Sequence, residues 1–76
     1  MDAPTSPLSP DRWIETIFAS KAARDGKVVR RSLHDIQRYA TLDRFTREVQ
    51  RRGYAAVRNG DQIVIFCNQD GIRRFA

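Results

Sequence analysis

Apolar residues recur along this chain with two spacings, every three or four positions in its first half and in short unbroken runs near its end. From Pro10 to Gly26 the spacing is helical. One apolar stripe is formed there by Trp13, Ile14, Ile17, Phe18 and Ala22. Ser9 is suited to cap this helix and Pro10 to occupy its first position. The pattern predicts a helix that ends at Gly26, where a left-handed cap costs little.

The segment from Leu33 to Arg52 is helical in spacing but changes its apolar side halfway. At 100° per residue, Leu33, Ile36 and Ala40 share one side, whereas Leu42, Phe45 and Val49 point to the opposite side. One small core cannot cover both sides of a straight helix. The sequence therefore predicts two helices that meet at Ala40-Thr41, with N-caps at Ser32, aided by Asp35, and at Thr41, and with Gly53 ending the second.

Three short runs have the character of strands. Lys27 to Arg31 is β-branched at its centre, and the runs Tyr54–Arg58 and Asp61–Cys67 flank Asn59-Gly60. Asn-Gly between apolar runs predicts a hairpin with a type I′ turn. Because Ile63 to Phe66 are apolar without alternation, we expect that strand to be central and covered on both faces, next to the first strand. Residues 69–76 fit either an edge segment or a closing turn.

The length of 76 residues allows one domain. We expect a flexible tail over residues 1–8, rich in proline and small polar residues, and a single α+β domain over 9–76. The sequence has one cysteine and no leader or long apolar run, which favours the cytoplasm. So small a core has little stability to spare, and a homodimer stays open.

Positive charge is concentrated after Gly26, where eleven of the fourteen basic residues lie, and the net charge of the chain is +5. Twelve of the fourteen are arginine, whose planar guanidinium forms bidentate hydrogen bonds with phosphate and guanine. A codon bias toward arginine would leave the same composition. On the predicted helix that ends at Arg52, an arginine-rich face lies opposite the apolar one, with Asp43 at its margin. This face holds Arg44, Arg47, Arg51 and Gln50.

The predicted order of helix, strand, helix, helix, strand, hairpin and strand over roughly residues 10–68 resembles the winged helix-turn-helix family. The resemblance implies a DNA-binding, transcription-regulating protein whose last helix enters the major groove. It assigns the groove contacts to the arginine-rich face just described, with Gln50 suited to adenine. Contacts with the flanking DNA backbone are implied for Arg30, Arg31, Arg58 and Asn59.

Two other kinds of binding protein stay open. The spacings Asp43–Arg47, Arg44–Glu48 and Glu48–Arg52 are typical of ion pairs on a solvated helix. In that case the chain would be an adaptor or inhibitor. It would bind an acidic protein through Tyr54, Arg51 and Arg52. The stretch from Phe45 to Phe66 is also similar to small RNA-cleaving toxins with a double-stranded-RNA-binding-like fold. Their Gly-Ser-His signature is replaced by Gly60-Asp61-Gln62, which implies RNA binding without cleavage.

No motif for catalysis or metal binding occurs in the sequence. The only histidine, His34, and the only thiol, Cys67, fall on different predicted elements, and two ligands do not make a structural zinc site. We expect Cys67 to be buried at a strand end and His34 to be exposed at a helix start. The prediction is a protein that is not an enzyme and has no cofactor and no metal.

Overall fold

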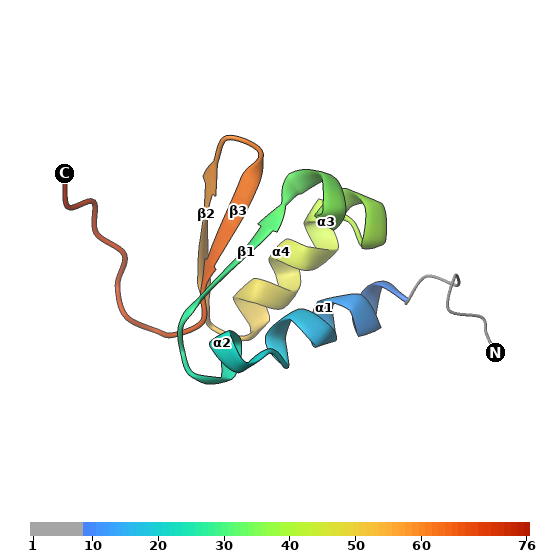
Figure 1. Cartoon of the computed structure of the whole chain (residues 1–76), viewed down its shortest axis with the longest axis horizontal. Helices are drawn as coiled ribbons and strands as arrows, with labels where there is room; N and C mark the ends of the chain where they lie inside the picture. The colour runs from blue at the N-terminus through green and yellow to red at the C-terminus, as the bar shows by residue number, and fades with distance from the viewer. Residues whose placement is uncertain (1–8) are drawn as a thin grey trace.

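The computed structural model describes residues 9–76 and has four helices and one three-stranded sheet there (Figure 1). The tail predicted for residues 1–8 lies outside the described residues. The elements in chain order are α1 (Pro10–Phe18), α2 (Lys21–Arg24), β1 (Val28–Ser32), α3 (Leu33–Tyr39), α4 (Leu42–Arg51), β2 (Ala55–Asn59) and β3 (Gln62–Phe66).

The first helix begins as predicted but ends early. The Ser9 hydroxyl accepts a hydrogen bond from the backbone N–H of Arg12 at 3.2 Å, and Pro10 is the first helical residue. The prediction of one helix reaching Gly26 is wrong, because α1 ends at Phe18 and Ser20 caps a separate turn, α2, by accepting from the N–H of Ala23. A serine side chain that satisfies backbone donors competes with helix continuation.

The predicted break between two helices is present. α3 ends at Tyr39 and α4 begins at Leu42, and the Thr41 hydroxyl accepts from the N–H of Arg44 at 3.1 Å. Ser32 caps α3 in the same way through the N–H of Asp35. The break lets both helices bury their apolar sides in one core.

The sheet is antiparallel throughout, in the order β1-β3-β2, so β3 is the central strand as predicted. The hairpin is confirmed, but its two turn residues are Gly60 and Asp61, since Asn59 pairs with Gln62. Of these two turn residues, only Gly60 has a positive φ, +62°, which is the pattern of a type II′ turn with glycine first and not of type I′.

The helices cover one face of the sheet only (Figure 1). Ile63 and Ile65 of β3 are buried beneath them, while Val64 and Phe66 on the other face are half-buried. The prediction that this strand is covered on both faces is therefore wrong. An unbroken apolar run was compatible with two-sided burial, but no element of the described chain lies over the second face.

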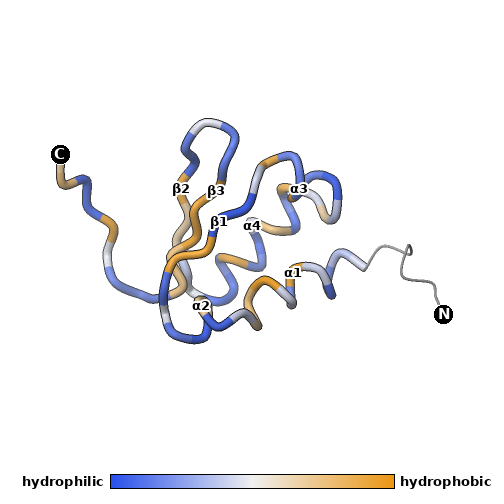
Figure 2. The backbone as a smooth tube through the Cα atoms, in the orientation of Figure 1, coloured by the Kyte–Doolittle hydropathy of each residue, from blue (hydrophilic) through white to orange (hydrophobic). Residues whose placement is uncertain are grey.

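The core is centred on Phe45 of α4, whose side chain is almost fully buried. The Phe45 ring lies 6.1 Å from that of Phe18 and 6.3 Å from that of Trp13, between ring centroids. Trp13 stacks in turn on Tyr39 at 5.3 Å, so the aromatic residues join α1, α3 and α4. Figure 2 shows apolar segments along β1 and β3, whereas the tip of the β2–β3 hairpin is hydrophilic.

The prediction that Leu42 points inward is wrong, because 38% of its surface is exposed. It stands at the first position of α4, beside a groove between α4 and β2, where no further element reaches it. No helix among residues 9–76 is long and apolar enough to cross a membrane.

Candidate nucleic-acid interface

The predicted arginine-rich face of α4 is divided between two surfaces. Phe45 and Val49 fix the rotation of the helix by pointing into the core. Arg44 and Arg51 consequently line a cleft toward α1, and only Arg47 stands on the side facing away from the core. All three arginines are exposed, but Arg44 and Arg51 line the cleft beside α1 and Arg47 does not.

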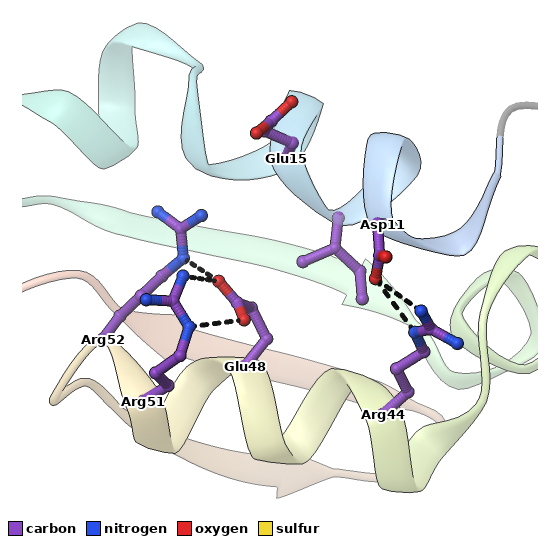
Figure 3. Close-up of a pocket in the computed structure, with 7 residues that line it drawn as sticks. Asp11, Glu15, Arg44, Glu48, Arg51 and Arg52 are labelled. Carbon is purple, nitrogen blue, oxygen red and sulfur yellow. Dashed lines mark hydrogen bonds and ion pairs between the residues drawn. The ribbon is translucent and has the colours of Figure 1, made fainter.

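Arg44 is held across this cleft by an acid of another helix. Its Nε and one terminal nitrogen donate to the same carboxylate oxygen of Asp11 on α1, at 3.0 and 2.8 Å (Figure 3). The predicted pair of Arg44 with Glu48 does not form. Arg44 therefore ties α4 to α1, a contact that only the folded chain creates.

Glu48 is the other acid of the cleft, and it pairs with two arginines. Arg51 donates from its Nε to Glu48 at 2.9 Å, and Arg52 donates from its Nε at 2.8 Å, the latter as predicted from their spacing (Figure 3). The hydrogen bond from Arg51 lowers the pKa of Glu48 to about 2, opposed by partial burial and aided by Arg52. The cleft thus holds three arginines and three acids, and two of these acids, Asp11 and Glu48, form its ion pairs.

Arg47 carries the most available positive charge of α4. It pairs with Asp43 one turn earlier, at 2.7 Å, but both side chains are more than 70% exposed. An ion pair so exposed contributes a few tenths of a kcal/mol to stability, so a phosphate can replace Asp43 as the partner of Arg47 at little cost.

A groove connects α4 to the hairpin. It lies between α4 and β2, has a volume of about 480 Å³, and is lined by Thr46 and Gln50 of α4 and by Arg58 of β2. The Nε of Arg58 donates to the carbonyl of Gly60 at 2.8 Å, which keeps this guanidinium at the hairpin tip. Gln50 and Arg58 thus line one groove, and Arg47 lies about one turn before Gln50 on α4.

The two arginines of β1 lie on opposite faces of the sheet. Arg31 is aligned with Ile63 and, through it, with Arg58, so Arg31 and Arg58 share the helix-covered face near the tip. Arg30 is aligned with Val64 and Val57 and points to the uncovered face. Of the predicted backbone contacts, the structure therefore brings Arg31 and Arg58 together on the helix-covered face, whereas Asn59, aligned with Gln62, lies on the uncovered face with Arg30.

One neighbour of the hairpin tip was not assigned to this surface from the sequence. The backbone N–H of Leu33, the first residue of α3, donates to the carbonyl of Asp61 in the turn at 2.7 Å. The exposed His34 follows directly, and thus lies beside the tip. Only the pairing of β1 with β3, residues far apart in sequence, brings it there.

The residues assigned to the alternative, protein-binding surface are largely occupied inside the domain. The Tyr54 ring lies 5.7 Å from that of Phe18, and the Arg52 guanidinium lies over the Phe18 ring at 4.6 Å. Both side chains are half-buried. Of that set only Arg51 is well exposed.

Cys67 is buried at the end of β3, as predicted, and burial raises the pKa of its thiol, with a smaller opposing effect from Arg52. His34 lies on α3, is exposed, and is not part of an arrangement with Cys67. Across residues 9–76, no three side chains among His, Cys, Asp and Glu gather closely enough to hold a metal ion.

Comparisons with known proteins add no relative to this picture: no family model, curated protein or solved structure matches the chain. The sheet order β1-β3-β2, with two helices between the first two strands, is compatible with a winged-helix-like topology.

Proposed function

We propose that this protein binds nucleic acid, and duplex DNA in particular, through the outer side of α4 and the tip of the β2–β3 hairpin. The observation that carries the proposal is the shared surface on which Gln50 of α4 and Arg58 of β2 line one groove, next to the exposed Arg47. In the winged-helix manner of binding, a helix enters the major groove while the hairpin contacts the flanking backbone.

The proposed contacts differ in kind. Arg47 and Gln50 are the residues for the base edges, since arginine pairs with guanine and glutamine with adenine in the major groove. Arg58 and Arg31, which share the helix-covered face near the tip, are the residues for phosphate, together with Asn59, which adjoins the turn on the other face. Arg44 and Arg51 bear on binding only through the ion pairs that hold α4 in place, and Arg30 stands outside the surface.

A titration of a labelled random duplex at several salt concentrations tests this proposal. For the unaltered protein, affinity should fall steeply with salt, because each neutralised phosphate adds a slope of about 0.9. The double variant Arg47→Ala/Arg58→Ala should lower that slope by up to about two units and weaken binding at every salt concentration.

The matched control removes the same charge elsewhere. Arg12→Ala/Arg24→Ala takes two exposed arginines from α1 and α2 and should leave the salt slope nearly unchanged. Equal losses in both double variants would mean that binding depends on net charge alone, and the proposed surface would be wrong. No binding of the unaltered protein at low salt would reject the DNA function itself.

The same titration with a double-stranded RNA distinguishes DNA binding from RNA binding. A double-stranded RNA of the same length should bind more weakly, since its deep and narrow major groove does not admit a helix. Tighter binding of the RNA duplex would replace the winged-helix manner of binding by shape recognition.

A further inference from the structure

The strand β2 has an unpaired edge that the rest of the described chain leaves open. The carbonyl of Asn59 closes the turn with Gln62, and hydrogen-bonded pairs alternate along an antiparallel ladder. Ala55, Val57 and Asn59 therefore direct their backbone groups to β3. Ala56 and Arg58 direct theirs outward, away from the sheet.

The two edges of the sheet differ in how they are protected. Natural edge strands are kept from pairing by charges, proline, bulges or a covering element. The β1 edge carries Arg30 and Arg31, with Lys27 directly before it. The β2 edge, Ala55–Asn59, has a single charge, no proline, and all five residues exposed.

That single charge does not stand in the way of another strand. The side chain of Arg58 is bonded to the carbonyl of Gly60 in its own turn, at 2.8 Å. It thus points along the strand toward the tip instead of across the edge. The charge distribution leaves β2, and not β1, open to a partner.

An apolar groove runs beside this edge. Its walls include Leu42 on α4 and Tyr54, Ala55 and Val57 on the strand side. Leu42 and Val57 are exposed by 38% and 39%, which makes them two of the five exposed large hydrophobic residues in the described chain. A strand that pairs with β2 would lie directly beside Val57, whereas Leu42 lies on α4 across the groove.

We propose that β2 pairs with β2 of a second copy of this chain, antiparallel and centred on Val57, to form a six-stranded sheet. In this register Ala56 of each copy lies opposite Arg58 of the other, and these are the residues whose N–H and C=O groups face outward. Four new backbone hydrogen bonds result. Val57 meets its own counterpart, and the two Arg58 side chains are kept apart at opposite ends of the pair.

Neighbouring registers are less favourable. Centring the pair on Arg58 would set two guanidinium groups directly opposite each other, which is destabilising. Centring it on Ala56 would require the N–H of Tyr54 as a hydrogen-bond donor to the second copy, but this N–H already donates to the carbonyl of Val49 at 3.1 Å. The Val57-centred register uses every outward group of the edge without either conflict.

The size of the surface sets the strength of this dimer. The groove has eleven lining residues, which include all of β2 except Asn59, against the 20–30 residues and roughly 800 Å² per partner of a stable protein interface. The dimer should therefore be weak, with a dissociation constant on the order of micromolar or above, and should form as concentration rises. It does not depend on the nucleic-acid proposal, and its test contains no nucleic acid.

The test is sedimentation equilibrium of the full chain, which compares the unaltered protein with the variants Val57→Lys and Val28→Lys. Concentrations run from about 10 µM to about 1 mM, so that they bracket a micromolar dissociation constant. Val28 is the matched control, because it lies on the same face of the sheet, at the other edge, with a similar exposure of 43%. Val57→Lys should raise the dissociation constant at least about tenfold through like-charge repulsion across the two-fold axis. Val28→Lys should leave it unchanged.

Two further measurements identify the register. An equimolar mixture of Val57→Lys and Val57→Glu should recover the dimer, since opposite charges then meet at the axis. Hydrogen exchange should show the amides of Ala56 and Arg58 becoming protected as concentration rises, while those of Ala55 and Val57 are protected at every concentration.

Three results would overturn the proposal. One is a chain that stays monomeric throughout the concentration range, and another is a dimer weakened by Val28→Lys but not by Val57→Lys. The third is concentration-independent protection of Ala56 and Arg58, which would show that the edge is already covered within a single copy of the chain. Circular dichroism of each variant excludes unfolding as the cause of any loss.

Discussion

Individual side chains in the cleft between α1 and α4 carry the clearest electrostatic consequences. Glu48 accepts hydrogen bonds from Arg51 and Arg52, and its pKa is lowered to about 2. Since the folded pKa lies below the unfolded one, this carboxylate stabilises the fold above about pH 4.5 and loses that contribution as the pH falls toward 2. The cleft therefore favours a folded state at neutral pH.

Replacing Glu48 tests this contribution. Glu48→Gln should lower the free energy of unfolding at pH 7 by about 1 kcal/mol, a value reduced to allow for partial exposure of the network. The variant should also show a flatter dependence of stability on pH between 5 and 2. Urea unfolding at several pH values measures both effects.

Glu15→Gln is the control for this measurement. Glu15 lines the same cleft from α1 but forms no ion pair with the residues drawn there (Figure 3). Its replacement should leave the pH dependence almost intact. Equal effects of the two variants would show that the field of the whole cleft, and not the contacts of Glu48, sets the acid stability.

A second consequence at this scale concerns Asp43, the exposed partner of Arg47. On the proposed DNA surface this carboxylate repels phosphate and occupies the arginine. Asp43→Asn should therefore tighten binding of a duplex several-fold at low salt, with little change in stability. Fluorescence anisotropy measures the change, and weaker binding by this variant would mean that the face around Arg47 is not used.

At the scale of single elements, the chain's short polar residues could be interpreted correctly from the sequence. Ser9, Ser32 and Thr41 cap the helices that they were predicted to cap, because these caps depend only on neighbouring residues. Ser20 was missed, since the apolar stripe continues past it to Ala22. Local pattern could not decide between a capped break and an unbroken helix there.

The turn of the β2–β3 hairpin depends on the backbone conformation of Gly60. Gly60 has a φ of +62°, and a Cβ added there would meet no atom within 4 Å. Gly60→Ala should therefore cost about 1 kcal/mol from backbone conformation alone. Thermal unfolding measures this cost.

Gly71→Ala separates the conformational cost from a general effect of alanine. Gly71 also has open space around it but no positive φ, so its replacement should leave stability unchanged. A neutral Gly60→Ala would indicate that the turn relaxes to another type.

At the scale of the whole molecule, stability depends on a small aromatic core. A 76-residue domain has a free energy of unfolding of roughly 4–11 kcal/mol. Phe45→Ala removes the ring that contacts Trp13 and Phe18 and should cost about 3–5 kcal/mol, enough to populate the unfolded state. Urea titration followed by circular dichroism measures this change.

Phe45→Leu keeps most of the buried volume and should cost much less than Phe45→Ala. A small loss in both variants would mean that α1 and α4 can close together over the vacated space. The comparison thus measures how rigidly the core holds α4.

The sequence could not predict which elements lie next to one another in the folded chain. The division of the arginine-rich face between two surfaces depends on α1 lying beside α4, and the pair of Arg44 with Asp11 joins residues 33 positions apart. The same holds for His34, which reaches the hairpin tip through the pairing of β1 with β3. Helical spacing orders residues on one element but does not say which other element lies next to it.

The strand order has a consequence for synthesis of the chain on the ribosome. β3 is the common partner of β1 and β2, yet it is translated after both of them. A nascent chain that stops short of Ile63 holds two strands with nothing to pair between them, and a core that lacks Ile63 and Ile65. The domain is thus expected to fold in one step once β3 emerges, leaving its apolar segments accessible to chaperones until then.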